Sequence, residues 1–131
     1  MRIVLDTNVI VAAFATRGLC AEVFEVCVTG HTLVISEHIL SEVNSALVKK
    51  IKLQKSIAID VISYLRDIGE LVEPDPVDSS VCRDKDDLVV IGAAIRGKAA
   101  VLVTGDADIL SLRNYQGVDF ITPREFWNRM R

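Results

Sequence analysis

Short apolar runs rich in β-branched residues alternate with longer segments of helical periodicity along most of this 131-residue chain. Runs of this kind are typical of strands buried on both faces, and helices between them favour right-handed crossovers between parallel strands. The sequence therefore predicts an α/β fold, a three-layer α/β/α sandwich around a mainly parallel sheet of about five strands. The predicted strands are 3–5, 31–35, 71–72, 99–103 and 118–121.

Apolar residues at three- and four-residue spacing predict the helices that connect these strands. The predicted helices cover 9–14, 19–28, 37–50, 53–68 and 88–95, followed by a short helix after Asp108 and a last one after Thr122. The segment 37–68 is expected to form a helical hairpin. Because no linker is long enough to separate two folding units, the chain is predicted to be one domain spanning 1–131.

The composition excludes several classes of protein. Apolar residues make up 50% of the chain, which argues against disorder, yet no apolar run approaches the roughly 18 residues that a membrane helix needs. The first residues lead directly into a strand, without the charged, apolar and small-residue regions of a signal peptide. Cys20, Cys27 and Cys82 lack CxxC spacing, which argues against a disulfide framework and a structural zinc site. We therefore expect a reduced, cytoplasmic protein without a membrane segment.

Acidic residues recur where predicted strands end or where the next helices begin. Asp6 follows the first strand, Asp106 and Asp108 follow a later strand, and Asp84 and Asp87 precede an apolar helix. Each acid alone is also explained as a helix cap. Because parallel strands end at one edge of a sheet, however, all five are expected to lie close together. Clustered carboxylates repel one another and suit Mg²⁺ or Mn²⁺, so the pattern predicts a divalent-metal site.

Two further features leave alternatives open. Glu42 borders the apolar face of the predicted helix 37–50, and it is either an ordinary surface glutamate or a residue at the rim of the core. Lys49, Lys50 and Lys52 cluster at the turn of the helical hairpin. They form either a solubilising loop or a rim that faces phosphate groups.

The net charge of −3 makes the chain as a whole an unpromising nucleic-acid binder. The distribution of charge changes this conclusion, because removing six acids that could share the site from the 18 acids leaves 12 against 15 basic residues. The remaining surface is then compatible with a phosphate-bearing partner. His31 and His38 are expected to lie away from the acids.

The ordered acids, taken with the strand and helix pattern, resemble the PIN domain family, and the similarity extends over essentially the whole chain. Within that family the sequence is most similar to the toxin-like, VapC-like branch of prokaryotic toxin–antitoxin pairs, including its terminal strand and last helix. Lys85 is one departure, because many such proteins have proline there. The motifs that carry the resemblance are Asp6-Thr7-Asn8, Glu42, Arg83-Asp84-x-Asp86-Asp87, Thr104-Gly105-Asp106-x-Asp108 and Thr122-Pro123-Arg124-Glu125-Phe126.

The resemblance implies roles for individual residues. The catalytic acids would be Asp6, Glu42, Asp87 and Asp106, and the metal ligands Asp6, Asp87 and Asp106 with Asp84 and Asp108 as auxiliary acids. Side chains that orient carboxylates or water would be Asn8 and Thr104. Basic residues at the substrate would be Lys49, Lys50, Lys52 and Arg83.

The implied activity is that of a metal-dependent endoribonuclease that hydrolyses phosphodiester bonds of single-stranded RNA with Mg²⁺ or Mn²⁺. The products would carry a 5′-phosphate and a 3′-hydroxyl. The same resemblance implies a cognate antitoxin protein and a homodimer, formed through an apolar patch on the 37–68 hairpin or on the first helices.

Other functions remain to be weighed against this one. A PIN-like module that binds RNA or protein without cleaving it, and a housekeeping RNA-processing nuclease, share the same pattern. A phosphoacceptor receiver domain also combines an α/β fold with acids around Mg²⁺, but it needs an aspartate after its middle strand and a lysine after its last strand. Ser36 and Thr122 follow the corresponding strands here, so the sequence does not fit that class.

Overall fold

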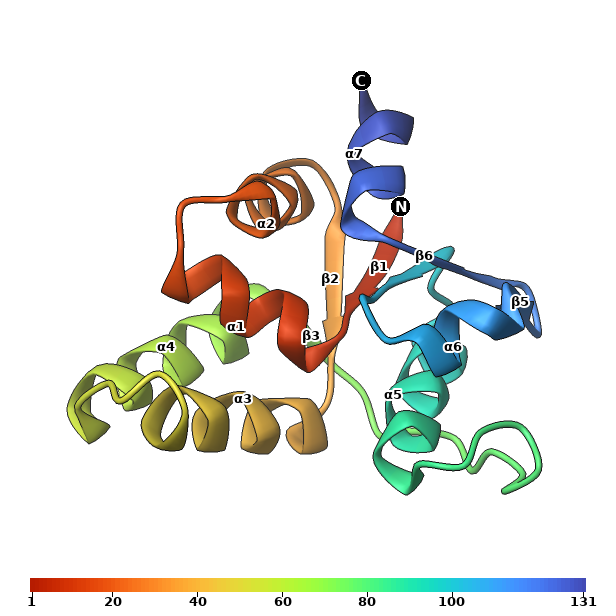
Figure 1. Cartoon of the computed structure of the whole chain (residues 1–131), viewed down its shortest axis with the longest axis horizontal. Coiled ribbons are helices and arrows are strands. Elements are labelled where there is room, and N and C mark those ends of the chain that lie inside the picture. Colours follow the sequence, from red (N-terminus) through yellow and green to blue (C-terminus); the bar gives the residue numbers. More distant parts are fainter.

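A six-stranded sheet runs through the middle of the protein in the computed structural model, which describes residues 1–131 (Figure 1). The strand order is β3-β2-β1-β4-β6-β5, and every neighbouring pair is parallel except β5 with β6. This confirms the predicted α/β class and the mainly parallel sheet. The strands are β1 (Arg2–Leu5), β2 (Thr32–Ile35), β3 (Glu70–Leu71), β4 (Val101–Val103), β5 (Asn114–Tyr115) and β6 (Val118–Ile121).

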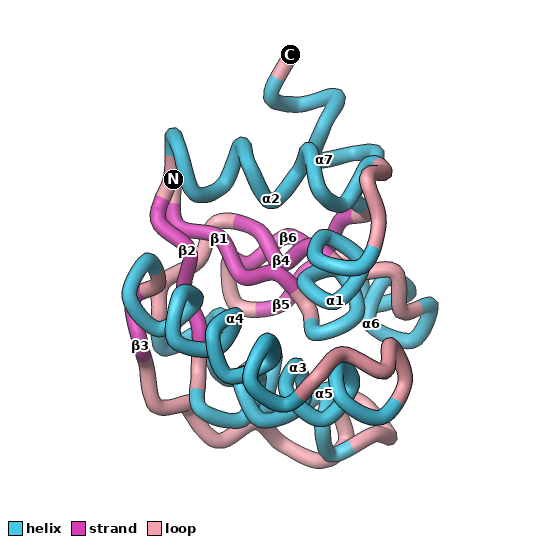
Figure 2. Tube along the Cα trace, turned by 90° about the vertical axis from the view of Figure 1, so that its left-hand side faces the viewer, coloured by secondary structure: helices cyan, strands magenta, loops and turns pink.

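Seven helices surround this sheet, with α1 to α4 on one side of the central strands and α5 and α6 on the other (Figure 1). The last helix packs beside α2 (Figure 2). No helix has both the length and the apolar character required to cross a membrane. The helices are α1 (Thr7–Ala15), α2 (Leu19–Gly30), α3 (Glu37–Lys49), α4 (Lys55–Ile68), α5 (Lys85–Arg96), α6 (Ala107–Leu112) and α7 (Pro123–Met130).

The core lies where the middle strands meet the helices. β1 and β4 are inner strands, and their apolar side chains are almost completely removed from water because helices cover both faces of the sheet. Helix α5 packs closely against the backbone of Asp75, in the segment that precedes the helix. A Cβ added at Gly92 would lie 2.2 Å from the carbonyl oxygen of Asp75, so this contact requires glycine.

Local capping signals place the ends of the helices as expected. The hydroxyl of Ser36 accepts the N–H of Ile39 and caps α3. Thr122 and Glu125 form the predicted capping box at the start of α7. These boundaries depend on hydrogen bonds within a few residues, which explains why the sequence alone could indicate them.

Apart from shifts of one or two residues at the ends of other elements, two details of the fold differ from the sequence-based prediction. The end of the chain contains a hairpin rather than a single strand, because the two-residue strand β5 pairs with β6 around a turn in which Gln116 and Gly117 have φ of 48° and 84°. The helix α5 begins at Lys85 rather than at residue 88, so the predicted acid Asp87 lies inside its first turn and Asp84 is its N-cap.

Candidate functional site

A cleft of about 360 Å³ opens at the edge of the sheet where the parallel strands end. The amino ends of α1, α5 and α6 and one side of α3 form its wall. Six of its thirteen lining residues are carboxylic acids and two are lysines, so the cleft is strongly acidic with a basic rim. The lining residues are Asp6, Thr7, Asn8, Glu42, Ser45, Ala46, Lys49, Lys50, Asp84, Asp86, Asp87, Val90 and Asp106.

Asp6 is held rigidly at the end of the inner strand β1. Its carboxylate caps α1 by accepting the N–H of Thr7 on Oδ1 at 2.8 Å, and Oδ2 accepts the hydroxyl of Thr104 at 2.7 Å. The residue is only 7% exposed. Burial raises the pKa of Asp6, and the hydrogen bonds from Thr104 and Thr7 oppose that shift.

Thr104 connects two acids that are far apart in the sequence. It is fully buried directly after β4, and its hydroxyl oxygen also accepts the backbone N–H of Asp106 at 3.0 Å. Asp106 in turn caps α6, because its Oδ1 accepts the N–H groups of Asp108 and Ile109. The Oδ2 atom of Asp106 accepts no hydrogen bond within the protein, which leaves it available to a ligand.

Asp87 enters the same cleft from the first turn of α5. It is 8% exposed, and its Oδ2 lies 3.6 Å from the Sγ atom of Cys82, which donates to it. Burial, followed by repulsion from Asp106 and Asp84, raises the pKa of Asp87 to about 6. Asp84 itself caps α5 by accepting the N–H of Asp86 at 2.8 Å.

Glu42 reaches the cleft from α3. Its Oε1 accepts the hydroxyl of Thr7 at 2.9 Å, and its side chain is 30% exposed. Burial raises the pKa of this carboxyl group as well. Of the two interpretations left open by the sequence, the structure therefore places Glu42 at the rim of the cleft rather than in open solvent.

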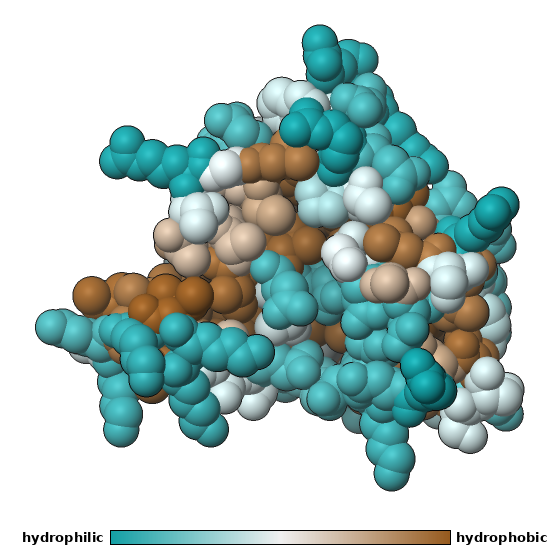
Figure 3. All heavy atoms as spheres, in the orientation of Figure 1, coloured by the Kyte–Doolittle hydropathy of each residue, from teal (hydrophilic) through white to brown (hydrophobic).

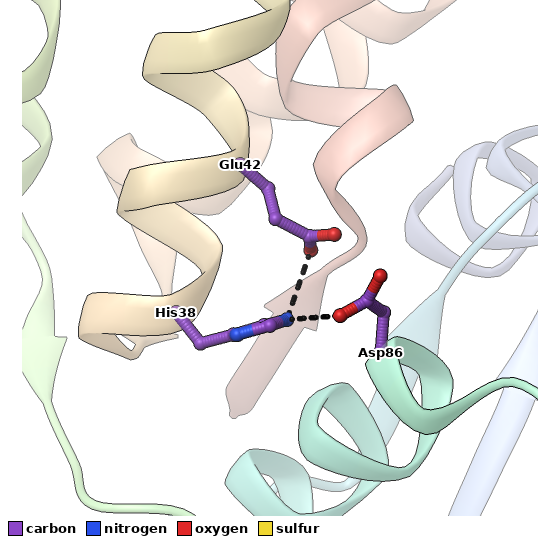
Figure 4. A group of neighbouring side chains, drawn as sticks. All are labelled: His38, Glu42 and Asp86. Carbon is purple, nitrogen blue, oxygen red and sulfur yellow. Dashed lines mark ion pairs between the residues drawn. The ribbon is translucent and has the colours of Figure 1, made fainter.

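The prediction that His38 lies away from the acids is wrong. His38 is one helical turn before Glu42 on α3, and its Nε2 lies 3.4 Å from Oε1 of Glu42 and 3.2 Å from Oδ1 of Asp86 (Figure 4). The i, i+4 spacing of His38 and Glu42 places both on one face of the helix, and it is the signal that could have revealed this contact. His31, in contrast, binds the amino terminus outside the cleft.

Four of the predicted site residues lie outside the cleft lining: Thr104 is fully buried, and the other three are exposed. Asp108 and Arg83 are exposed and form a long ion pair with each other, with 3.8 Å between Nη2 and Oδ2. Lys52 is exposed in the turn between α3 and α4. The structure therefore separates the side chains of Asp108, Arg83 and Lys52 from the acids that line the cleft.

The other predicted polar residues lie at the cleft in different ways. Lys49 and Lys50 line its rim at the end of α3. Asn8 lines it too, but its side chain is exposed and makes no hydrogen bond to a carboxylate. Thr104, as described above, is the one predicted orienting residue that hydrogen-bonds an acid.

The inner acids form a donor set that fits a hard divalent cation. Asp6, Asp87 and Asp106 come from β1, α5 and the end of β4, and they offer only carboxylate oxygens. Burial and mutual repulsion raise the pKa values of Asp6 and Asp87, and a cation between these groups would remove that repulsion. Mg²⁺ and Mn²⁺ prefer such oxygen ligands, completed by water.

Comparisons with known proteins agree with this architecture. The chain is similar to the uncharacterized protein MJ1680 of Methanocaldococcus jannaschii, with 26% identity over 147 aligned positions that cover 96% of this chain and 89% of that protein. Its fold is similar to the crystal structure of VapBC2 from Rickettsia felis bound to a DNA fragment from their promoter, with a TM-score of 0.64 and 17% identity over 93% of this chain and 98% of that one. The sequence pattern that defines the PIN domain matches residues 2–108, which contain every acid of the cleft. The chain therefore belongs to the PIN domain family.

Proposed function

We propose that this protein is a divalent-metal-dependent endoribonuclease that cleaves single-stranded RNA, and that it is the toxin of a type II toxin–antitoxin pair. The observation that carries the proposal is the convergence of Asp6, Asp87 and Asp106 with Glu42 in one cleft at the carboxyl edge of the sheet. Membership of the PIN domain family and the fold shared with VapBC2 support it.

The inner acids would bind the cation, and hydrogen bonds within the protein orient Asp6 before an ion is present. Asp6 is fixed by Thr7 and Thr104, so its carboxylate does not need to reorient when an ion binds. A bound Mg²⁺ or Mn²⁺ would supply activation of a water molecule and stabilisation of charge at the scissile phosphate. Glu42, whose pKa is raised by burial, lies at the edge of the cleft where it can accept a proton from water.

The rim of the cleft suits a polyanionic substrate. Lys49 and Lys50 lie at the end of α3 beside the acids, where they can contact phosphates on either side of the cleaved bond. The cleft is open and polar, with only two hydrophobic lining residues, which favours recognition of a backbone over recognition of bases. The backbone of a single-stranded RNA is free to enter such a cleft, because it is not held in a double helix.

An inhibitory partner is the second part of the proposal. Apolar side chains gather on the left of Figure 3, over α1 and α4, and Ile59 and Ile57 on α4 are 64% and 45% exposed. An antitoxin that covers this apolar surface and extends an arginine or lysine into the acidic cleft would block it.

The direct test compares the purified protein with the Asp6→Asn variant and with Asp60→Asn, which changes an exposed acid on α4 outside the cleft lining. Each is incubated with a single-stranded RNA, the DNA of the same sequence and a duplex RNA, with Mg²⁺, Mn²⁺ or EDTA. We expect metal-dependent cleavage of the single-stranded RNA that Asp6→Asn loses and Asp60→Asn keeps. Full cleavage by Asp6→Asn, with metal still required, would refute the assignment.

Two alternatives have distinct outcomes in the same experiment. A non-catalytic binding module would retain RNA in a filter-binding assay without cleaving it under any metal condition. A housekeeping nuclease would cleave RNA but would not arrest growth when expressed, whereas a toxin should arrest growth in a manner that depends on Asp6.

A further inference from the structure

A second group of metal-binding side chains lies beside the acidic cleft. His38 and Glu42 project from adjacent turns of α3, and Asp86 faces them from the first turn of α5 (Figure 4). One ligand atom from each residue lies within 4.8 Å of the other two. Neither His38 nor Asp86 belongs to the inner set of acids described above, and only Glu42 connects the two groups.

The ring nitrogen of His38 has an unusual environment. Its Nε2 atom is buried although the side chain as a whole is 32% exposed, and the atom has no hydrogen-bond partner. Carboxylate oxygens lie 3.4 Å and 3.2 Å away, on Glu42 and Asp86, but neither is aligned to accept a hydrogen bond from the nitrogen. A buried polar atom that faces two acids without a hydrogen bond lacks the group that would satisfy it.

We infer that His38, Glu42 and Asp86 form a binding site for a transition-metal dication of the Zn²⁺ class. Ligands about 2.0–2.2 Å from a tetrahedral ion lie roughly 3.3 Å from one another, which matches the two distances from Nε2. An ion on the axis of the ring nitrogen would also explain the poor hydrogen-bond alignment, because both oxygens would then lie to the sides of that axis. Three protein ligands leave a fourth position for water, as in open zinc sites.

The imidazole distinguishes this site from the inner one. Nitrogen ligands favour Zn²⁺, Ni²⁺ and Cu²⁺, whereas Mg²⁺ binds almost only to oxygen. The His38 site should therefore select a transition metal, while Asp6, Asp87 and Asp106 offer an oxygen-only set. Glu42 lines the cleft and belongs to the His38 site, and its Oε1 also accepts the hydroxyl of Thr7. A metal ion bound at His38 would thus also bind Glu42, which is a residue of the cleft.

The test uses Co²⁺ as a spectroscopic substitute for Zn²⁺, added to the metal-free protein without RNA. We expect the intense visible bands of four-coordinate Co²⁺, displaced by Zn²⁺ and not by Mg²⁺, in the wild-type protein and in His31→Ala, which removes the other histidine of the chain. The bands should be lost in His38→Ala and at least tenfold weaker, at equal Co²⁺, in Asp86→Asn. Asp86 is 60% exposed, so its variant keeps the test valid even if His38→Ala does not fold.

Three results would overturn the inference. Unchanged bands in His38→Ala and Asp86→Asn would place the ion elsewhere, and a sulfur-to-cobalt charge-transfer band would implicate a cysteine such as Cys82. Weak bands of six-coordinate Co²⁺ only, or no binding, would show that the imidazole is an ion-pair partner of the two acids and holds no metal. Because no RNA is cleaved in this experiment, its failure leaves the proposed nuclease function untouched.

Discussion

The inner acids Asp6 and Asp87 and the outer acids Asp86 and Asp108 all lie at helix starts in the sequence, but their environments in the structure differ. Asp6 and Asp87 are 7% and 8% exposed, and both have raised pKa values. Asp86 and Asp108 also lie at the start of helices, but their side chains are 60% and 55% exposed. The same position at a helix start therefore gives either a buried carboxylate with a raised pKa or an exposed one, depending on how deeply the packed elements bury it.

The largest expected effect comes from the innermost acid. Asp6→Asn should lower the metal-dependent rate of RNA cleavage by more than about 100-fold, which exceeds the roughly 10–100-fold typical of residues that only orient a ligand. The rate is measured on a labelled single-stranded RNA at saturating Mg²⁺. A loss smaller than that of Asp108→Asn would reverse the proposed order of inner and outer acids.

Removing the hydroxyl that connects two inner acids should have a smaller effect. Thr104→Val keeps the shape of the side chain but removes the donor to Asp6 and the acceptor for the N–H of Asp106. We expect cleavage to need about 10- to 100-fold more Mg²⁺ for half of its maximal rate. The measurement is a Mg²⁺ titration of the cleavage rate, with folding checked by circular dichroism. An unchanged Mg²⁺ concentration at half of the maximal rate would mean that the Thr104 hydroxyl does not orient the metal ligands.

The raised pKa of Asp87 predicts a dependence of stability on pH in the absence of metal. The folded protein holds the proton of this carboxyl up to about pH 6, whereas an unfolded chain releases it near 3.8, so the free energy of unfolding should fall between these values by up to about 3 kcal/mol. Asp87→Asn removes this loss and should therefore raise the melting temperature at pH 7.5 in EDTA.

Thermal denaturation at pH 4.5 and 7.5 measures this effect. The gain from Asp87→Asn should be several degrees at pH 7.5 and much smaller at pH 4.5, while Asp60→Asn should show neither. Added Mn²⁺ should stabilise the wild-type protein more than Asp87→Asn. Equal melting temperatures of the wild-type protein and Asp87→Asn at pH 7.5 would show that repulsion among the inner acids does not lower the free energy of unfolding.

The smallest expected effect lies at the basic rim. Lys49→Gln and Lys50→Gln should each lower kcat/KM a few-fold, mainly through KM, and should reduce the salt dependence of RNA binding by about one unit of slope. Lys52→Gln, which changes a lysine outside the cleft lining, is the matched comparison. Equal losses from all three lysines would indicate a general attraction of RNA instead of contacts at the cleft.

The sequence indicated most of the fold and the inner acids because these features depend on local patterns. Strands with β-branched residues, helices with apolar faces and caps such as Ser36 can be recognised within a few residues, and the parallel order then brings Asp6 and Asp106 to one edge. The match to the PIN domain over residues 2–108 is consistent with that prediction.

The features that the sequence did not indicate depend on how helices are placed against one another. His38 meets Asp86 only because α3 passes the start of α5, and no local pattern specifies that contact. Arg83 lies in the loop before α5 and Asp108 in the first turn of α6, and both side chains are exposed outside the cleft lining. The strand β5 is two residues long, too short for a periodicity to be recognised.

The double restraint on the Asp6 carboxylate has a consequence for the chemistry of ion capture. One oxygen is fixed by the N–H that begins α1 and the other by Thr104 at the end of the neighbouring strand β4, so the group loses its rotational freedom when the chain folds. An arriving ion then meets a ligand that is already oriented, and the entropic penalty belongs to folding instead of to metal association. The hydrogen bonds that join these two strand ends through Asp6 should therefore influence how tightly a metal ion binds at the proposed site.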